Sequence, residues 1–252
     1  HHYRQNKAEL ILLCQRKNWR LGMLDDLTNL QALLKDSTLL ATKGYLAGEW
    51  CDGESGQTFP VYNPARGDAV ADVSDISRTQ AAEAISIAEK AQKLWAARPA
   101  KERSHLLRNW YNLMMENQED LATILTVEQG KPIEEAKGEI AYGASFIEFF
   151  AEEAKRVYGE TIPGHQSDKR ITVLKQPVGV AASITPWNFP NAMITRKAGP
   201  ALAAGCAFVA RPAAETPLSA LAMGVLADRA GLPKGILSII PSSRSSEIGK
   251  EF

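Results

Sequence analysis

The segment that says most about the fold is Val178-Gly-Val-Ala-Ala-Ser-Ile-Thr-Pro-Trp-Asn-Phe-Pro190. Its apolar run Val178–Ile184 predicts a buried strand, and the turn that follows carries two prolines, a tryptophan and Asn188. A helical pattern begins at Asn191. In open α/β sheets, groups that bind or react with ligands lie where a strand ends before the next helix. The turn around Asn188 is therefore the first candidate site.

Strand and helix patterns alternate from this stretch onward. The expected elements are a strand over 178–185, a helix over 191–203, a strand over Cys206–Ala210, a helix over Pro217–Ala230 and a strand over Ile236–Ile240. This alternation predicts an α/β fold with a parallel sheet and right-handed crossovers. A parallel sheet with only three strands would leave an open edge, which is a liability. We therefore expect this chain to be truncated within a larger sheet.

The part before the parallel sheet has mainly helical patterns. We expect helices over Leu24–Leu40, Thr79–Ala97, Ala100–Asn117, Gln118–Gln129 and Ile133–Val157, with Thr79 as an N-cap. Short strands are expected over Tyr45–Trp50 and Thr58–Tyr62, around a turn at Cys51–Gly56. A strand hairpin is expected within residues 159–177, where it separates the helical part from the α/β part.

The first 23 residues differ from the rest, because there is no starting methionine and Met23 is the first one present. One hypothesis is that residues 1–22 are upstream or artificial sequence. An ordinary N-terminal helix is the alternative, since Lys7–Arg16 carries a helical stripe. The apolar run Leu10–Cys14 is too short for the core of a secretory signal.

Composition restricts the partners. The chain has 29 basic and 29 acidic residues, so a nucleic-acid binder driven by net charge is not expected. No apolar run approaches the ~20 residues that span a bilayer, and no membrane partner is expected. The odd, scattered cysteines Cys14, Cys51 and Cys206 indicate reduced thiols in a cytoplasmic protein. No histidine or cysteine spacing suggests a metal site.

The segment Ile184–Pro190 resembles the Pro-Trp-Asn-Phe-Pro segment of the aldehyde dehydrogenases, and the resemblance continues through Cys206. Further segments agree in order and spacing from about Leu24 to about Ile240. The resemblance implies oxidation of a small-molecule aldehyde with NAD or NADP. It also implies that the family's nucleophilic cysteine and general-base glutamate would lie beyond Phe252, so this chain is expected to be inactive alone.

The resemblance also implies an organisation for the chain. It implies an incomplete Rossmann-like parallel sheet preceded by a helical region, with an oligomerisation hairpin between them. The full-length protein is then expected to be a homo-oligomer. The expected parts are residues 1–23 as an extension, 24–158 as the N-terminal helical part of the cofactor-binding domain, 159–177 as the hairpin, and 178–252 as the truncated Rossmann-like part.

Asn188 is the candidate catalytic residue. An amide side chain together with a backbone N–H can stabilise a developing oxyanion, an effect worth ~3–4 kcal/mol in acyl-transfer enzymes. The alternative is an asparagine that only closes its own turn, and spacing alone favours this alternative. In the family that the segment resembles, this asparagine holds the thiohemiacetal oxygen, so the resemblance favours the catalytic role.

The cofactor cleft is expected between this turn and the segment Phe208–Pro217. Arg211 stands where the family has a lysine that binds the adenine ribose, and Ala214 stands where it often has a glutamate or serine. Both departures leave the choice between NAD and NADP open, because the guanidinium fork differs from an ammonium and alanine offers no hydrogen bond. A surface charge is the alternative interpretation of Arg211. The expected cofactor-binding residues are Ile184, Thr185, Pro186, Trp187, Arg211 and Ala214.

Arg196 is the candidate substrate-binding residue, in the run Ala192–Lys197. A guanidinium there could pair with a substrate carboxylate. The run is similar to that of the succinate-semialdehyde dehydrogenases, where this arginine has that role, and a solvated helix charge is the alternative. Cys206 begins an apolar strand and is expected to be structural. Two functions remain: a fragment of a succinate-semialdehyde dehydrogenase, or a binding or assembly module that associates with a full-length subunit.

Overall fold

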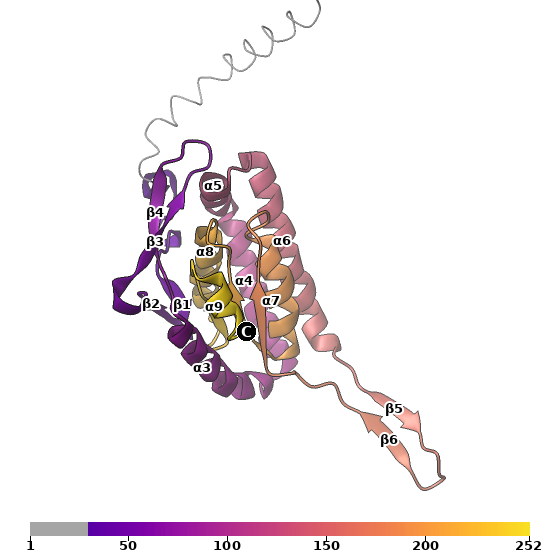
Figure 1. The fold of residues 1–252 in the computed structure, drawn as a ribbon. Coiled ribbons are helices and arrows are strands. Elements are labelled where there is room, and N and C mark those ends of the chain that lie inside the picture. Colours follow the sequence, from indigo (N-terminus) through magenta and orange to yellow (C-terminus); the bar gives the residue numbers. More distant parts are fainter. Residues whose placement is uncertain (1–29) are drawn as a thin grey trace, which may run out of the picture.

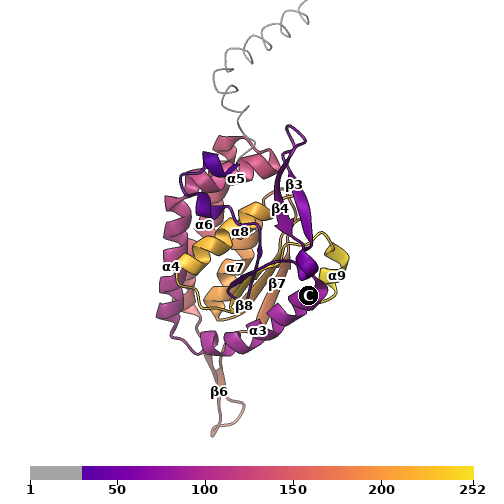
Figure 2. The same ribbon diagram turned by 90° about the vertical axis from the view of Figure 1, so that its left-hand side faces the viewer.

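The computed structural model describes residues 30–252 and has a five-stranded sheet at its centre (Figure 1). Helices α7 and α8 cover one face of the sheet, while α3 and α9 lie on the other side (Figure 2). A further layer of α4, α5 and α6 packs on α7 and α8, away from the sheet (Figure 2). The helices are α2 Leu30–Leu33, α3 Arg78–Ala96, α4 Ala100–Glu116, α5 Gln118–Gln129, α6 Ile133–Glu153, α7 Ala192–Ala204, α8 Pro217–Arg229 and α9 Ser245–Gly249, with short 3-10 turns η1 Ser37–Leu39, η2 Glu54–Gly56 and η3 Ala154–Arg156.

The central sheet contains the three predicted parallel strands and two further ones. Its order is β2-β1-β9-β8-β7, and β7, β8 and β9 are parallel, with Ile184 opposite Arg211. The expected alternation of strands and helices is therefore confirmed. The strands are β1 Gly44–Leu46, β2 Glu49–Cys51, β3 Thr58–Tyr62, β4 Ala69–Ser74, β5 Glu160–Pro163, β6 Arg170–Val173, β7 Val180–Ile184, β8 Ala207–Arg211 and β9 Leu237–Ile239.

The edge of the sheet beside β9 is not open, contrary to the expectation of a bare three-stranded sheet. The chain segment Tyr45–Trp50 was predicted as one strand, but it turns back at Ala47 and Gly48, whose φ values are 52° and 89°. The two halves, β1 and β2, form a hairpin, and β1 pairs antiparallel with β9. The backbone N–H of Ala47 also donates to Ser238 Oγ at 2.9 Å, which ties this turn to β9.

The next predicted strand belongs to a separate two-stranded sheet. Thr58–Tyr62 does form a strand, β3, but it pairs with β4 rather than with the segment around residue 45. The strand β4 was not predicted. The β3–β4 hairpin stands beside the end of the central sheet where β7 and β8 terminate, and it contributes one wall of the site described below (Figure 1).

Helix α3 begins one residue earlier than predicted, and its cap is different. Ser77 Oγ accepts from the backbone N–H of Gln80 at 3.2 Å, and Gln80 Oε1 accepts from the backbone N–H of Ser77 at 3.1 Å. Ser77, not Thr79, is therefore the N-cap, in a capping box. Near the end of the helix, Leu94 is 76% exposed, whereas Trp95 is buried and its Nε1 donates to the carbonyl of residue 202.

The predicted helix over Leu24–Leu40 is only partly within the described residues. Residues 24–29, like the expected extension over 1–23, lie outside them. Within the described part, α2 ends at Leu33, and Asp36 caps the 3-10 turn that follows by accepting from the backbone N–H of Thr38 at 3.1 Å. The aspartate competes with helix continuation, because its side chain satisfies a local backbone donor.

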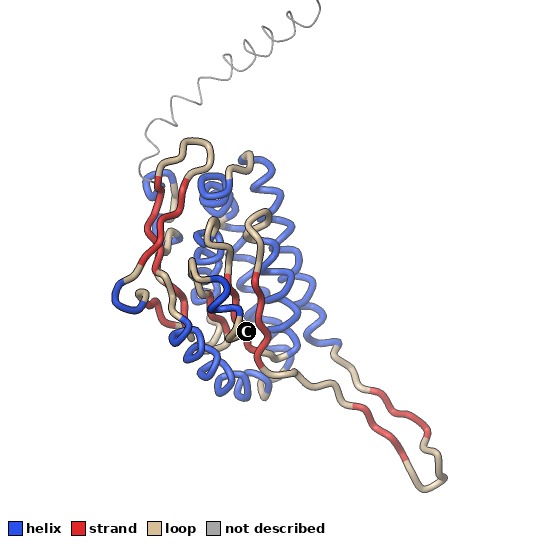
Figure 3. Tube along the Cα trace, in the orientation of Figure 1, coloured by secondary structure: helices blue, strands red, loops and turns tan. Residues whose placement is uncertain are grey.

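The hairpin of β5 and β6 projects away from the body of the molecule (Figures 1 and 3). Its strands are antiparallel, with Glu160 opposite Val173, and every residue of both strands is exposed. Helix α6 ends at Glu153, earlier than the predicted Val157, and the turn η3 leads into the hairpin. Within residues 30–252, each helix is too short or too polar to cross a membrane.

Candidate functional site

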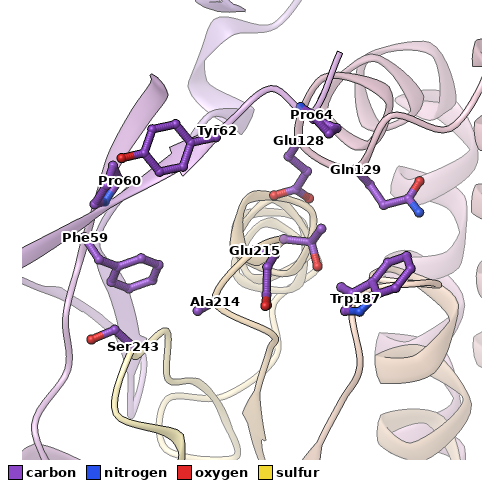
Figure 4. A pocket seen from close by; sticks show the side chains of 11 residues that line it. Phe59, Pro60, Tyr62, Pro64, Glu128, Gln129, Trp187, Ala214, Glu215 and Ser243 are labelled. Atoms are coloured by element: carbon purple, nitrogen blue, oxygen red, sulfur yellow. The ribbon is translucent and has the colours of Figure 1, made fainter. Parts of the chain in front are cut away.

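A cavity of about 540 Å³ lies at the end of the sheet where β7, β8 and β9 terminate (Figure 4). Figure 4 shows residues of the β3–β4 hairpin facing the turns that follow β7 and β8 across this space. The carboxyl ends of parallel strands are where α/β sheets bind ligands. The cavity is lined by Phe59, Pro60, Tyr62, Pro64, Glu128, Gln129, Trp187, Ala214, Glu215, Thr216 and Ser243.

The predicted cofactor residues fall into two groups. Trp187 and Ala214 line the cavity, one from each side. The residues Ile184 and Pro186 are exposed beside it at the end of β7, while Thr185 is buried and its backbone N–H donates to the carbonyl of residue 211 at 3.1 Å. The structure therefore brings together the two segments that the sequence analysis assigned to one cleft.

Arg211 is buried at the end of β8, so the surface-charge interpretation is wrong. Its Nη2 donates to the carbonyl oxygen of Ser242 at 2.8 Å, in the loop that follows β9. Burial lowers the pKa of this guanidinium from its ordinary value. Among the described residues, Arg211 Nε and Thr185 Oγ1 are buried and have no hydrogen-bond partner. Two buried polar groups at this end of the sheet thus lack a partner among the described residues.

Asn188 lies in the exposed turn between β7 and α7. Within the described part of the chain, its side-chain amide has no hydrogen-bond partner, so it does not close the turn in the way the alternative interpretation proposed. Its backbone carbonyl accepts from Lys131 Nζ at 3.1 Å. The amide is therefore free to bind a ligand, while the backbone beside it is held by another element.

Lys131 also forms an ion pair with the buried Glu139 of α6, with Nζ and Oε2 2.5 Å apart. Glu139 Oε1 accepts from the backbone N–H groups of Asn191 and Ala192 at 3.0 and 3.3 Å. These contacts fix the start of α7. The sequence gives no signal for either residue, because a lysine and a glutamate eight positions apart look like ordinary surface charges.

A second buried glutamate holds the start of α8. Glu128, the penultimate residue of α5, accepts from the backbone N–H groups of Leu218 and Ser219, both at 2.7 Å. Burial raises the pKa of Glu128 to about 8. Helix N-termini often bind phosphate groups. In this protein carboxylates occupy the first N–H groups of α7 and α8, which fits the absence of a glycine-rich phosphate fingerprint.

The loop after β9 is held by a third carboxylate, Asp75. It accepts from Ser242 Oγ at 2.9 Å and from the backbone N–H of Ser243 at 3.0 Å. Burial opposes ionisation of Asp75, but hydrogen bonds from Ser243 and Ser242 outweigh it and hold the pKa of this carboxyl below its usual range. The loop contacted by Arg211 is therefore itself fixed from the segment that precedes α3.

Arg196 lies on an exposed face of α7 and does not line the cavity. Its guanidinium is 5.5 Å from the ring centroid of Phe146, on α6. Within the described residues it has no carboxylate within ion-pair distance, so its charge is available to a ligand. The neighbouring Lys197 instead donates to the carbonyl of Met193 at 2.9 Å.

Cys206 is buried immediately before β8, at the opposite end of that strand from Arg211. Because β7 and β8 are parallel, this thiol lies at the amino-terminal ends of the strands, whereas Asn188 follows the carboxyl-terminal end of β7. It cannot reach a substrate bound at the Asn188 turn. Over residues 30–252, there is no group of three histidine, cysteine or acidic side chains that could hold a metal ion.

Residues 50–252 match the aldehyde dehydrogenase family, and the chain belongs to that family. It is 58% identical over 219 residues to a glutarate-semialdehyde dehydrogenase of Pseudomonas aeruginosa, covering 87% of this chain and 45% of the relative. It is 56% identical to the NADP+-dependent succinate-semialdehyde dehydrogenase of Escherichia coli, again covering 87% and 45%. The chain thus spans about half the length of the curated relatives it matches.

Solved structures agree with this assignment. The crystal structure of a succinate-semialdehyde dehydrogenase from Burkholderia pseudomallei superimposes with a TM-score of 0.85 at 54% identity, covering 86% of this chain and 45% of that one. An NADP-dependent enzyme of E. coli gives the same TM-score at 56% identity, with the same coverage. The predicted family and the predicted incomplete α/β fold are therefore confirmed.

Proposed function

We propose that this chain forms the part of an NAD(P)+-dependent semialdehyde dehydrogenase that holds the dinucleotide and supplies the oxyanion donor. The observation that carries the proposal is that the Asn188 turn and Arg211 follow adjacent ends of β7 and β8, and that their neighbours Trp187 and Ala214 line one cavity. The relatives named above act on semialdehydes of dicarboxylic acids. The proposed reaction is the oxidation of an aldehyde with a carboxylate at its far end, succinate semialdehyde to succinate.

The residues at the cleft fit a dinucleotide. Thr185 Oγ1 and Arg211 Nε are buried polar groups without a protein partner among the described residues, and a ribose or phosphate oxygen could satisfy them. Pro186 and Trp187 would pack against the cofactor, and Ala214 would leave space without adding a charge. Bound NAD or NADP would accept hydride from the substrate.

Asn188 and Arg196 would act on the substrate. The Asn188 amide would donate to the oxygen that becomes negatively charged, and removal of one such donor lowers kcat by about 10²–10³-fold in acyl-transfer enzymes. Arg196 would pair with the carboxylate at the other end of the substrate, because a guanidinium binds a carboxylate through two parallel hydrogen bonds. Exposure of Asn188 and Arg196 on the same strand–helix unit supports these roles.

The test is a titration of the 252-residue chain with NAD+ and with NADP+, monitored by tryptophan fluorescence. The variant Trp187→Phe identifies the part of the signal that comes from Trp187. We expect saturable quenching that Arg211→Ala weakens about tenfold, as for loss of a charged hydrogen bond. The matched control is Arg98→Ala, which changes an exposed arginine away from the cavity. Absence of binding by both nucleotides would contradict the proposal.

Turnover provides a second test. With succinate semialdehyde, the 252-residue chain is expected to reduce neither NAD+ nor NADP+. The reason is that Cys206 is buried at the end of the sheet opposite to the Asn188 turn. Reduction that disappears in Cys206→Ser would overturn the roles assigned above.

A role in assembly is a second candidate function, favoured by the projecting hairpin. Its strands and the segment after them expose Ile162, Ile171, Val173 and Leu174, the last at 74%. Exposed apolar residues on a two-stranded arm suit contact with another subunit. We propose that this arm joins copies of the full-length protein, in the cytoplasm, where the free thiols of Cys51 and Cys206 would stay reduced. Co-purification with a full-length subunit, lost on deletion of residues 160–173, tests this role.

A further inference from the structure

The turn between β7 and α7 has few means of holding its own shape. Pro186 and Pro190 have no backbone N–H. Among the described residues, the backbone N–H groups of Trp187, Asn188 and Phe189 have no hydrogen-bond partner either. Trp187 is also 54% exposed. The conformation of this turn must therefore depend on contacts from other elements.

One such contact acts at the middle of the turn. Lys131 lies between α5 and α6, and its Nζ donates to the carbonyl oxygen of Asn188 at 3.1 Å. The same nitrogen is 3.9 Å from the ring centroid of Phe189, within the range of a cation–π interaction. Lys131 therefore orients the peptide group that joins Asn188 to Phe189.

A second contact acts at the end of the turn, where Glu139 accepts from the backbone N–H groups of Asn191 and Ala192. A carboxylate is favoured at this place, because the N-terminus of a helix carries partial positive charge. Glu139 therefore fixes the point at which α7 begins. Its first residue, Ala192, comes four residues after the proposed oxyanion donor Asn188.

The two contacts are parts of one device. The side chains of Lys131 and Glu139 are only 12% and 1% exposed, and they form the 2.5 Å ion pair described above. We propose that this pair clamps the turn at two points, the Asn188 carbonyl and the start of α7, so that Lys131 and Glu139 are positioning residues for the Asn188 amide. The inference rests on the oxyanion role proposed for Asn188, but the clamp itself can be measured without substrate or cofactor.

The experiment compares the 252-residue chain with the double variant Lys131→Met/Glu139→Gln. Both charges are removed together, because a single change would leave an unpaired buried charge that could unfold the protein. Lys131→Arg tests rescue, since a guanidinium can also donate to both partners. Lys137→Met is the matched control, because Lys137 lies on α6, the helix of Glu139, and pairs with Glu119 at 2.8 Å away from the turn.

Two signals report on the clamp. Amide hydrogen exchange at Asn191 and Ala192 is expected to accelerate about tenfold or more in the double variant, as for loss of a charged hydrogen bond. The NMR signal of the Asn188 side-chain amide, assigned through its loss in Asn188→Asp, is expected to show a lower order parameter. Lys131→Arg should retain most of the order, and Lys137→Met should match the parent.

Three results would overturn the clamp: unchanged exchange at the turn in the double variant, equal acceleration throughout the chain, or the same loss of order in Lys137→Met. Failure of the proposed function would look different. It would be a chain that binds neither NAD+ nor NADP+, while the exchange and NMR results for the turn would stay interpretable.

Discussion

Helices α7 and α8 begin in the same way, yet their two caps differ electrostatically. Each helix follows a parallel strand, and each has its first N–H groups bound by a buried glutamate from the helical layer, Glu139 for α7 and Glu128 for α8. Glu139 has Lys131 as a partner at 2.5 Å. Among the described residues, Glu128 has no basic partner within ion-pair distance, and burial raises its pKa to about 8.

The difference follows the exposure of the two turns. The turn before α8, over residues 212–216, is largely buried and needs no second tether. The turn before α7 carries Asn188 and is largely exposed, and there a lysine joins the cap to the backbone of the turn. A buried glutamate is sufficient to start a helix, whereas holding an exposed turn in one orientation takes a paired charge as well.

The largest effect on stability is expected when Glu139 loses its basic partner, so that the α7 cap resembles the unpaired α8 cap. Lys131→Met leaves Glu139 buried and unpaired, and breaking a buried pair from one side costs ~3–5 kcal/mol. Urea unfolding should show this loss in free energy of unfolding. The double variant Lys131→Met/Glu139→Gln should recover part of it, because no uncompensated charge remains. A single variant as stable as the parent would show that Lys131 does not compensate Glu139.

The second test concerns the pH dependence that the α8 cap should confer. The pKa of Glu128 rises from about 4.5 unfolded to about 8 folded. Between these values the folded protein binds a proton that the unfolded chain has released. The free energy of unfolding therefore falls as pH rises through this window, by at most ~1.4 kcal/mol per pH unit.

Glu128→Gln cannot titrate, so its unfolding free energy should lose this part of the slope between about pH 4.5 and about pH 8. The measurement is urea unfolding of parent and variant at several pH values in that window. Equal slopes in the two proteins would mean that the hydrogen bonds from Leu218 and Ser219 keep Glu128 ionised in spite of its burial.

The third test concerns the close approach of α6 that lets Glu139 reach α7. A Cβ at Gly143 would lie 2.2 Å from Asn191 Oδ1, so Gly143→Ala should push the helices apart and destabilise the fold by ~1–3 kcal/mol. Gly138→Ala is the matched control on the same helix, where a Cβ meets no atom within 4 Å. Thermal unfolding should show destabilisation for Gly143→Ala and, for the control, a small gain from higher helix propensity. Equal effects would contradict the close approach.

The smallest effect on stability is expected for the cap of α3, which comes from its own sequence, unlike the caps of α7 and α8, which come from other helices. Helix α3 is capped by its own Ser77, three residues from Gln80, and needs no residue from another element. Ser77→Ala should cost ~1 kcal/mol, while Thr79→Ala should stay within ~0.5 kcal/mol. Urea unfolding of the two variants would distinguish them, and the reverse order would restore Thr79 as the cap.

Local sequence patterns are enough to predict most of the helices and strands. The strand–turn–helix order from residue 178 to 240 follows from apolar runs, prolines and helical periodicity, and the structure agrees within about two residues at most boundaries. Asn188 and Arg211 were placed at strand ends for the same reason. The resemblance of the Ile184–Pro190 segment gave the family, because that string is specific and needs no tertiary information.

Which distant residues meet depends on the packing of the whole chain. The β1–β2 hairpin extends the sheet beside β9 and contacts it across 191 residues of sequence, and Glu139 and Glu128 reach their helices across 52 and 90 residues. No periodicity marks such pairs, because a buried carboxylate looks like any surface acid until the fold brings a helix N-terminus to it. The burial of Arg211 and the clamp on Asn188 both result from contacts between residues far apart in the chain. Local sequence patterns therefore cannot predict them.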